Sequence, residues 1–482
     1  MVTMGKCKHF RVCEVDDPNL TEGDLCILHS TDPYKSRMSF TKALDAHRQR
    51  EHGASNFGRM VFPDLMDFTQ NTFNERADFS WTEFMNGSNF DGATFAKGAN
   101  FARSKFTEDV NFQRTTFAET AWFNRAVFTG NATFWDSTFS RVHFTGTKFE
   151  GSAEFCAVQF LGVARFGETE FRGEANFSDS HFADVAFFPH LIFSAPVLFS
   201  SVRFGNGVIF NSVIFMKNAE FSNAVFHNEC EFAAVDFAEE AVFTGASFLE
   251  RTIFSGGNGN SVFLGETNFE KVISTDEALR FVQVDLSRCR FLGADVRKIQ
   301  FIGVKWSIIG DRDGICDELA CEPNQWAYVE DIYRQLKQNY ENRRDFERAG
   351  HFHVGEKEMR LRNTETRVDL RVLLSLYKLL AMYGESYRQP LLWFLGLWLY
   401  TSLLVLVGGL VVKDGTNVVP LSTTSLSDFG WAFLYGLQTI FHLNGKEFTP
   451  QGFGWVVHML ASILGPVLVA LAGFALRQRL KR

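Results

Sequence analysis

Residues 90–112 read FDGATFAKGANFARSKFTEDVNF, and the phenylalanines in this stretch stand five or six residues apart. The spacing alternates between five and six from Phe57 to Phe254, so the repeat is eleven residues long, and one slip between Phe134 and Phe149 runs five, five, five. An α-helix does not produce this pattern, because successive phenylalanines would fall near opposite sides of the helix. A chain that turns a corner every five or six residues and points one side chain inward does produce it. We therefore predict a solenoid filled with phenylalanine rings.

A small residue stands two places before the central phenylalanine in Ala99-Asn100-Phe101, Ala132-Thr133-Phe134, Ala153-Glu154-Phe155 and Ala175-Asn176-Phe177. These triplets, and the strict five-residue spacing that returns between Phe281 and Trp306, resemble the pentapeptide-repeat proteins. The resemblance implies a mainly β fold over residues 55–310, a right-handed quadrilateral β-helix with two eleven-residue units in each coil. The strand spacing gives roughly ten or eleven coils. The glycine-rich run from Gly256 to Asn260 predicts a loop that bulges from one coil.

The composition of the repeat region argues against catalysis. Its outward residues vary irregularly and form no grouping of His, Asp and Ser that suggests a pocket, so we do not expect an enzyme. Between residues 55 and 275 there are 26 acidic and 15 basic residues, a net charge of −11. Some pentapeptide-repeat proteins resemble DNA in shape and charge and bind topoisomerases. The membrane segments described below argue against that role, and we expect no nucleic-acid partner.

Residues 1–50 contain three cysteines and a histidine, Cys7, Cys13, Cys26 and His29, close together in the sequence. Thiolates and a neutral imidazole suit a closed tetrahedral zinc site. A segment this short and polar needs a structural metal ion, or a similar cross-link, to fold alone. The sequence therefore predicts a structural zinc cap, with His9 as an alternative ligand and a capping segment with free thiols as the alternative reading. The first eleven residues lack the apolar segment of a signal peptide, and the scattered cysteines fit a reducing compartment.

Residues 322–388 change to a helical pattern. Apolar residues from Trp326 to Phe346 recur at intervals of three and four, and a second run covers about residues 366–382. We interpret these segments as adapter helices between the β-helix and a membrane. A metal site could be formed by His351, His353 and Glu356, but the sequence favours a solvated connection between helices at these residues.

Two apolar stretches in residues 389–482 predict transmembrane helices. Residues 391–412 carry no charge and are long enough to cross a bilayer, and residues 453–476 form a second such stretch. Basic residues gather before the first span and in the tail Arg477-Gln478-Arg479-Leu480-Lys481-Arg482. The positive-inside rule places both termini in the cytoplasm. We expect a multi-pass protein of the bacterial inner membrane.

The segment between the spans, residues 426–450, contains a helical stretch too short to cross a bilayer and a loop. The order of span, half-helix, loop and span resembles the pore module of two-span potassium channels. That resemblance places a re-entrant pore helix here, Thr439 at the foot of the filter and Gly445 as its last glycine. The Gly-Tyr-Gly of potassium-selective filters is absent, so we expect a cation pore that is less selective among ions. Side chains of His442, Asn444 or Glu447 would set its ion preference.

These observations predict a homo-oligomeric ion channel, most simply a tetramer. The cytoplasmic β-helix would assemble with its neighbours, bind a protein partner or bias gating, with Gly465, Pro466 and Gly473 as bending points of the second span. Packing glycines are an alternative explanation for these three residues. The alternative function is a membrane-anchored pentapeptide-repeat scaffold without pore activity.

Overall fold

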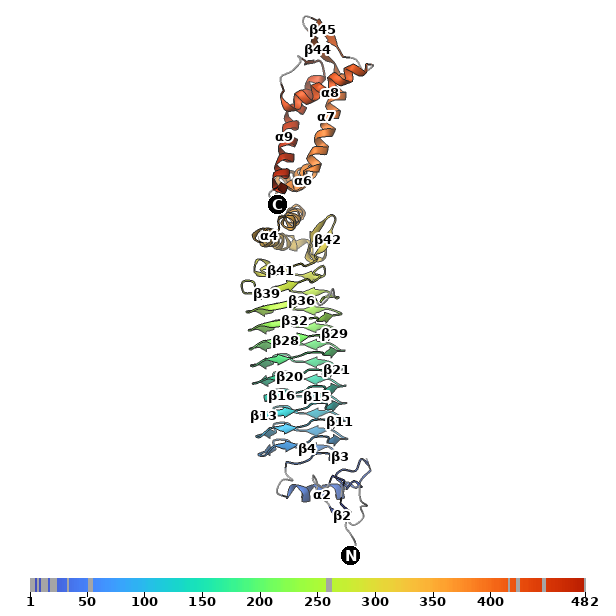
Figure 1. Ribbon diagram of the computed structural model, residues 1–482, viewed down its shortest axis with the longest axis vertical. Coiled ribbons are helices and arrows are strands. Elements are labelled where there is room, and N and C mark those ends of the chain that lie inside the picture. Colours follow the sequence, from blue (N-terminus) through green and yellow to red (C-terminus); the bar gives the residue numbers. More distant parts are fainter. Residues whose placement is uncertain are drawn as a thin grey trace. The chain divides into compact units, whose positions relative to one another are not determined.

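The computed structural model describes residues 5–6, 8–9, 16–17, 24–32, 34–50, 55–256, 262–414, 417–421, 425–443 and 448–480. Contacts divide the chain into two compact units, Met1–Ala320 and Cys321–Arg482. The first unit is a β-solenoid and the second is mostly helical (Figure 1).

The solenoid has four faces, and each face is a ladder of very short parallel strands. Two of the faces form separate ladders of 9 and 11 strands, and the other two join into a sheet of 19 strands.

The 9-stranded ladder consists of β3 (Val61–Phe62), β7 (Glu83–Phe84), β11 (Lys105–Phe106), β14 (Val127–Phe128), β17 (Lys148–Phe149), β21 (Glu170–Phe171), β25 (Ile192–Phe193), β29 (Ile214–Phe215) and β33 (Asp236–Phe237).

The 11-stranded ladder consists of β4 (Met66–Asp67), β8 (Ser88–Asn89), β12 (Val110–Asn111), β15 (Ala132–Thr133), β18 (Ala153–Glu154), β22 (Ala175–Asn176), β26 (Val197–Leu198), β30 (Ala219–Glu220), β34 (Ala241–Val242), β37 (Thr267–Asn268) and β40 (Cys289–Arg290).

The 19-stranded sheet consists of β5 (Thr72–Phe73), β6 (Ala77–Asp78), β9 (Thr94–Phe95), β10 (Ala99–Asn100), β13 (Thr116–Trp122), β16 (Thr138–His143), β19 (Gln159–Phe160), β20 (Ala164–Arg165), β23 (His181–Phe182), β24 (Ala186–Phe187), β27 (Arg203–Phe204), β28 (Val208–Asn211), β31 (Val225–Phe226), β32 (Cys230–Ala233), β35 (Ser247–Phe248), β36 (Thr252–Ser255), β38 (Ile273–Ser274), β39 (Leu279–Val282) and β41 (Gln300–Ile302).

The register of these ladders confirms the predicted solenoid. Ala99 pairs with Ala77 on one side and with Ala121 on the other, so two eleven-residue units make one coil. Stacked coils place identical rings above one another: Phe84 and Phe106 have centroids 4.8 Å apart and planes 3° apart. Within a coil, rings also meet edge to face, as Phe84 does with Phe90 at 6.0 Å, a geometry that aromatic pairs prefer. The small residues of the quoted triplets, Ala99, Ala132, Ala153 and Ala175, are fully buried.

The slip in the phenylalanine spacing is absorbed at one corner. In the pairing of β13 with β16, Phe117 lies opposite Phe139 but Thr120 lies opposite Arg141, with a register irregularity between Phe117 and Thr120. Strand β16 therefore uses one residue fewer than β13 to pass this corner. Phe123 still stacks on Phe144 at 4.9 Å, so the core continues through the shorter coil. The predicted loop at residues 256–260 falls mainly on residues 257–261, which lie outside the described residues.

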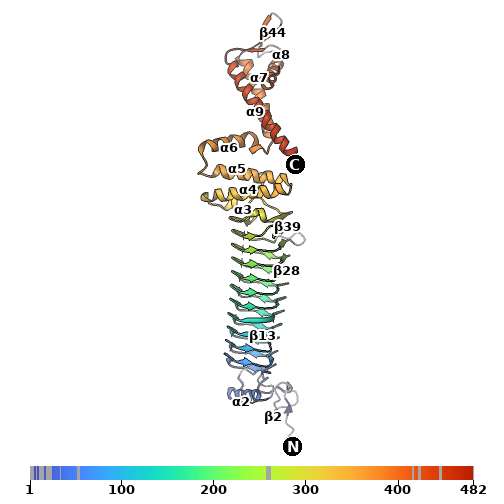
Figure 2. The ribbon, with the colours of Figure 1, turned by 90° about the vertical axis from the view of Figure 1, so that its left-hand side faces the viewer.

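Both ends of the solenoid are covered. Near the N-terminus, β1 (Gly5–Lys6) pairs with β2 (Asp16–Asp17), and α2 (Arg37–Arg48) lays Phe40 across the first coil, 5.8 Å from the Phe62 ring. At the other end, η1 (Val296–Lys298), the hairpin β42 (Ser307–Ile309)–β43 (Arg312–Gly314) and α3 (Cys316–Ala320) follow the last coils (Figure 2). Asp317 in α3 accepts a hydrogen bond from the backbone N–H of Phe291 at 3.1 Å, and burial raises the pKa of this carboxyl to about 6. In earlier coils the corresponding N–H donates to a backbone oxygen of the next coil, as Phe269 does to Arg290. The Asp317 carboxylate accepts this hydrogen bond where the coils end.

The second unit begins with η2 (Pro323–Gln325), α4 (Trp326–Asn342) and α5 (Phe346–Arg362), which pack against each other, and continues with α6 (Val368–Ala381) and η3 (Met382–Gly384). Two long helices follow, α7 (Arg388–Gly408) and α9 (Gly454–Leu480). Between them lie α8 (Leu426–Phe441) and the antiparallel strands β44 (Leu410–Asp414), β45 (Asn417–Pro420) and β46 (Phe448–Pro450).

The first apolar span ends earlier than the sequence suggests. Residues 391–412 were expected to be one helix, but α7 stops at Gly408, Gly409 has a φ of +96°, and residues 410–414 form β44. Val411 and Val412 are apolar because β44 is buried between its two neighbouring strands. A short apolar run looks the same in the sequence whether it forms a buried strand or the end of a membrane helix.

Candidate functional site

Two helices of the second unit are long and apolar enough to cross a membrane, Arg388–Gly408 and Gly454–Arg477. Large apolar side chains are exposed along both of them, among them Leu392, Leu399, Leu403, Leu460 and Ile463. Exposed leucines and isoleucines at this density are typical of helices that face lipid.

The shorter helix α8 packs against both α7 and α9, which also pack against each other. The Trp398 indole N–H of α7 donates a hydrogen bond to the backbone oxygen of Phe433 in α8 at 2.9 Å. A Cβ on Gly436 of α8 would lie 2.7 Å from the Ser402 hydroxyl and 2.9 Å from the Trp398 ring, so only glycine permits this approach. Small residues at such contacts let membrane helices approach closely.

The carboxyl end of α8 lies deep beside the two long helices. A Cβ on Gly465 of α9 would lie 2.5 Å from a methyl carbon of Ile440, so the two helices touch here. Gly465 lies about 16 Å along α9 from the beginning of that helix at Gly454. On the α7 side, the Phe441 ring lies 5.7 Å from the ring of Phe394, which is nearer the beginning of α7 than its end.

The strands before and after α8, β45 and β46, lie at the other end of the two long helices, where α7 ends and α9 begins, because both pair with β44. There β46 pairs with β44, with Leu410 opposite Pro450. Thus α8 runs inward from the end at which Figure 1 shows β44 and β45, and β46, the next described strand, lies at that same end because it pairs with β44.

A polar cluster lies between α8 and α9. The Tyr435 hydroxyl and Nδ1 of His458 are hydrogen-bonded at 2.7 Å, and the Thr439 hydroxyl lies 3.4 Å from the same nitrogen. His442, at the C-cap of α8 in a left-handed conformation, donates from Nδ1 to the backbone oxygen of Thr439 at 3.0 Å. Tyr435 and Thr439 are buried, whereas His442 is exposed.

The predicted pore residues fall into two groups. Thr439 and His442 are in the cluster described above, whereas Asn444, Gly445 and Glu447 lie outside the described residues. Sequence reasoning missed Tyr435 and His458 as site residues. The one signal was that His458 interrupts an otherwise apolar span.

The three predicted bending points have different surroundings. Gly465 is in contact with Ile440, Pro466 lies inside an uninterrupted α9, and a Cβ on Gly473 would meet nothing within 4 Å. A role for any of them in gating stays a prediction.

Of the four predicted zinc ligands, the structure describes two. Cys26 and His29 are both buried, with Sγ and Nδ1 3.2 Å apart, and the His9 ring lies 5.0 Å from the His29 ring. Cys7 and Cys13 lie outside the described residues. Among the residues that are described, no three His, Cys, Asp or Glu side chains are grouped closely enough to hold a metal ion.

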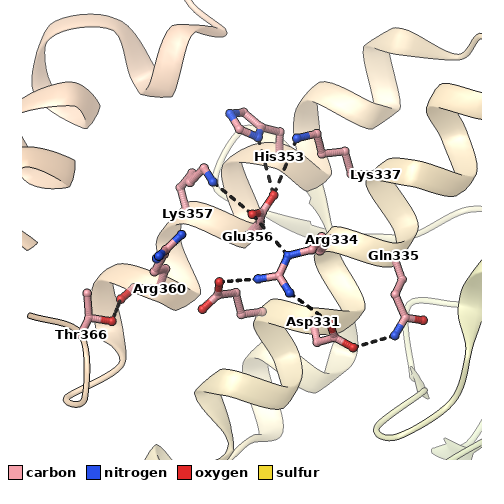
Figure 3. Close-up of polar contacts among 10 residues, drawn as sticks. Asp331, Arg334, Gln335, Lys337, His353, Glu356, Lys357, Arg360 and Thr366 are labelled. Carbon is pink, nitrogen blue, oxygen red and sulfur yellow. Dashed lines mark hydrogen bonds and ion pairs between the residues drawn. The ribbon is translucent and has the colours of Figure 1, made fainter. Parts of the chain in front are cut away.

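Glu356 in α5 is the centre of a cluster of lysine, arginine and histidine side chains (Figure 3). Its carboxylate lies 3.0 Å from the Lys357 ammonium and 3.7–3.8 Å from Arg334, Lys337 and His353. Burial alone would raise the pKa of Glu356, but the contacts with His353 and Lys357 and the charges of Lys357 and Lys337 lower it to about 2. The expected solvated helix connection is therefore wrong. These residues lie inside α5, and Glu356 is only 5% exposed because α4 packs over it.

Replacing Glu356 with glutamine is expected to destabilise the α4–α5 pair by about 3–5 kcal/mol at neutral pH, because the cations around it lose their counter-charge. Since the folded pKa is below the unfolded value, this contribution is present above pH 4.5 and is lost as the pH falls toward 2. Guanidinium unfolding of the full chain in detergent, followed by the helical signal at pH 7 and pH 3, measures both effects. Glu347→Gln, at an exposed position of α5, is the control; an equal loss in the two variants would refute the charge argument.

Residues 101–147 match the family model described as pentapeptide repeats (9 copies). No curated protein matches the chain. The family match and the solenoid together support a pentapeptide-repeat protein, and the two apolar helices are compatible with a membrane-anchored one.

Proposed function

We propose that the protein is an oligomeric ion channel with a pentapeptide-repeat domain attached to its pore-forming unit. One observation carries the proposal: the carboxyl end of α8 reaches Gly465 of α9, whereas β46, the next described strand, lies beside β44 at the end where α9 begins. A helix of 16 residues is about 24 Å long, too short to cross a bilayer core of about 30 Å. The contacts of α8 therefore support a re-entrant pore helix.

The position of α8 also favours a cation as the conducted ion. The carboxyl end of a helix carries the negative end of the helix dipole. In the proposed arrangement this end lies at mid-depth, where water is scarce and its field is strong. The backbone after α8 is tolerated at that depth only if it is buried in protein or lines water. This requirement supports an assembly of several chains around an axis, most simply a tetramer.

The charge distribution supports a topology with the solenoid and the C-terminus in the cytoplasm of a bacterial cell. Arg371, Arg388 and Arg477 stand at the end where α7 begins and α9 finishes, and the segment between the spans carries only Lys413 and Lys446 as basic residues. Basic residues are retained on the cytoplasmic side during insertion.

A membrane-anchored scaffold is the second candidate function. The direct packing of α7 against α9 favours it, because a plain helical hairpin is sufficient as an anchor. In this alternative the solenoid binds a cytoplasmic protein partner and α8 is only a packing element.

Ion flux through the purified full-length protein in liposomes distinguishes the two functions. We expect cation flux from the wild-type chain and none from a variant with residues 439–449 scrambled, which keeps the composition of the loop. Size-exclusion chromatography checks that both variants form the same assembly. Equal flux in the two variants, or no flux from the wild type across several cations, voltages and pH values, would contradict the channel.

We also propose that Cys7, Cys13, Cys26 and His29 hold a structural zinc ion. A tetrahedral site with Zn–S and Zn–N bonds of about 2.3 and 2.0 Å places S and N about 3.5 Å apart. The 3.2 Å between Cys26 Sγ and His29 Nδ1 supports such a site. Elemental analysis should find one zinc per chain and none in Cys26→Ala; folded wild-type protein without zinc would contradict the site.

A further inference from the structure

Helix α6 exposes an apolar face that no other element of the described chain covers. Val368, Val372, Leu373, Leu376 and Leu379 are 51–74% exposed, and their spacing places them on one side of the helix. The other side packs inward: Leu374 forms a small core with Val354 of α5 and Tyr383. The helix is thus apolar on both its packed face and its exposed face, which is unusual for a surface helix in water.

The position of α6 matches the boundary of the proposed membrane region. Only η3 and a short turn separate it from α7, and the Trp393 indole N–H in the second turn of α7 donates to the backbone oxygen of Leu379 at 3.0 Å. Figure 2 shows α6 lying across the end where α7 begins and α9 finishes. Tryptophan side chains favour the headgroup level of a bilayer, so this hydrogen bond places the end of α6 at that level.

Positive charges surround the same end of the unit. Arg371 lies on the flank of α6, exposed Arg388 opens α7, and Arg477 stands near the end of α9. Two of the acidic groups nearby pair with other cations, Asp369 with Arg367 at 2.7 Å and Glu358 with Lys378 at 2.9 Å, and the other two, Glu365 and Glu385, are fewer than the three arginines. The charge balance beside the apolar face is therefore positive.

We propose that α6 is an interfacial helix that binds the surface of an anionic bilayer. Its five exposed apolar side chains enter the boundary between headgroups and acyl chains, while Arg371 and Arg388 contact lipid phosphates. An apolar helix face flanked by basic residues binds membranes in this way. Continuity with two membrane-spanning helices selects lipid, rather than a second copy or another protein, as the occupant. The proposal rests on the membrane location proposed above.

The contacts of α6 also connect this lipid site with the adapter helices. Glu358 of α5 accepts a hydrogen bond from the Tyr383 hydroxyl at 3.0 Å and pairs with Lys378 of α6. A change in the depth of α6 therefore acts on α5 as well as on the second turn of α7.

Lipid contact is tested with an environment-sensitive fluorescent amino acid placed at one position of the full-length protein in nanodiscs. Position 376 probes the exposed face of α6, position 347 is the exposed control on α5, and position 399 reports whether α7 lies in the membrane. We expect nitroxide-labelled lipids to quench the probe at 376 at least about threefold more than the probe at 347. Quenching at 376 should be stronger with phosphatidylglycerol than with phosphatidylcholine alone, and Arg371→Gln should reduce that difference.

The three positions separate the ways in which the proposal can fail. Quenching at 399 without quenching at 376 overturns the interfacial helix but leaves the membrane location intact. No quenching at 399 refutes the membrane location, and the lipid proposal with it. A probe at 376 that is protected from both labelled lipid and aqueous iodide is covered by protein, which overturns lipid as the occupant. Equal quenching at 376 in the two lipid compositions overturns the preference for anionic lipid.

Discussion

Replacing Gly465 with alanine should lower ion flux at least about tenfold while the chain remains in the membrane. The added Cβ would lie 2.5 Å from one methyl carbon of Ile440 and 3.0 Å from two further carbons of that side chain. Carbon atoms pack best at about 3.5–4.0 Å, so α8 must move by roughly 1 Å or more. Ile440 is buried and β-branched, and its restricted rotamers prevent it from turning away. The displacement falls on the carboxyl end of α8, where the proposed pore loop begins.

Gly473→Ala is the matched control for this substitution. It lies on the same helix, it changes the same residue type, and its Cβ would meet nothing within 4 Å. We expect flux to fall at least about tenfold in Gly465→Ala, because overpacking typically costs about 1–3 kcal/mol, and to stay near the wild-type value in Gly473→Ala. The double variant Gly465→Ala with Ile440→Ala removes the two γ carbons of Ile440 at 2.5 and 3.0 Å and keeps only its Cβ at 3.0 Å, so it should recover much of the flux. Equal loss in both single variants would mean that helix stiffening, not the contact with α8, is responsible.

A similar pair tests the contact on the other side of α8. Gly436→Ala would meet Ser402 and Trp398 of α7, whereas Gly430→Ala on the same helix meets nothing within 4 Å. If α8 is only a packing element of a scaffold, neither pair of variants alters an ion current, because there is none. The glycine series therefore also separates the channel from the anchored scaffold.

The solenoid could be predicted from the sequence because every coil needs the same kinds of side chain at the same positions. Ala77, Ala99 and Ala121 pair in register from coil to coil, and the phenylalanines recur in the sequence with the same period. The slip near Phe139 was visible, but its position at the corner before Thr120 was not. That position depends on which corner can lose a residue without moving a ring, a property of three-dimensional packing.

The candidate site was less predictable because its residues are separated in the sequence and come together only when the helices pack. His458 bonds to Tyr435, far earlier in the chain, and neither residue carries a signal of its own apart from interrupting an apolar run. Glu356 was expected in a solvated helix connection. Arg334 and Lys337 are distant from it in the sequence and reach it only because α4 folds back on α5. Local composition predicts such charges to be solvated, whereas the helix packing buries them.

The solenoid should lose about 3–5 kcal/mol of stability when Phe134 is replaced with alanine, the usual cost of removing a buried phenylalanine side chain. The Phe134 ring is stacked between Phe112 at 5.1 Å and Phe155 at 4.8 Å, and the Phe123 and Phe144 rings meet its edges or faces at 5.6–5.7 Å. The variant therefore opens a cavity in three successive coils. Since each coil contacts only its neighbours, the loss should be concentrated there rather than spread along the solenoid.

Trp135→Ala is the control for this prediction, because it removes an aromatic side chain from the adjacent position, which is 51% exposed. We expect the control to change stability by less than about 0.5 kcal/mol. Hydrogen exchange of the full chain in detergent measures both variants, and Phe134→Ala should raise exchange mainly within about one coil on either side of residue 134. Uniform loss of protection along the solenoid would show that the coils unfold as one unit. A fold that tolerates local loss in this way keeps its capped ends intact, so Phe134→Ala should leave any ion flux through the second unit unchanged.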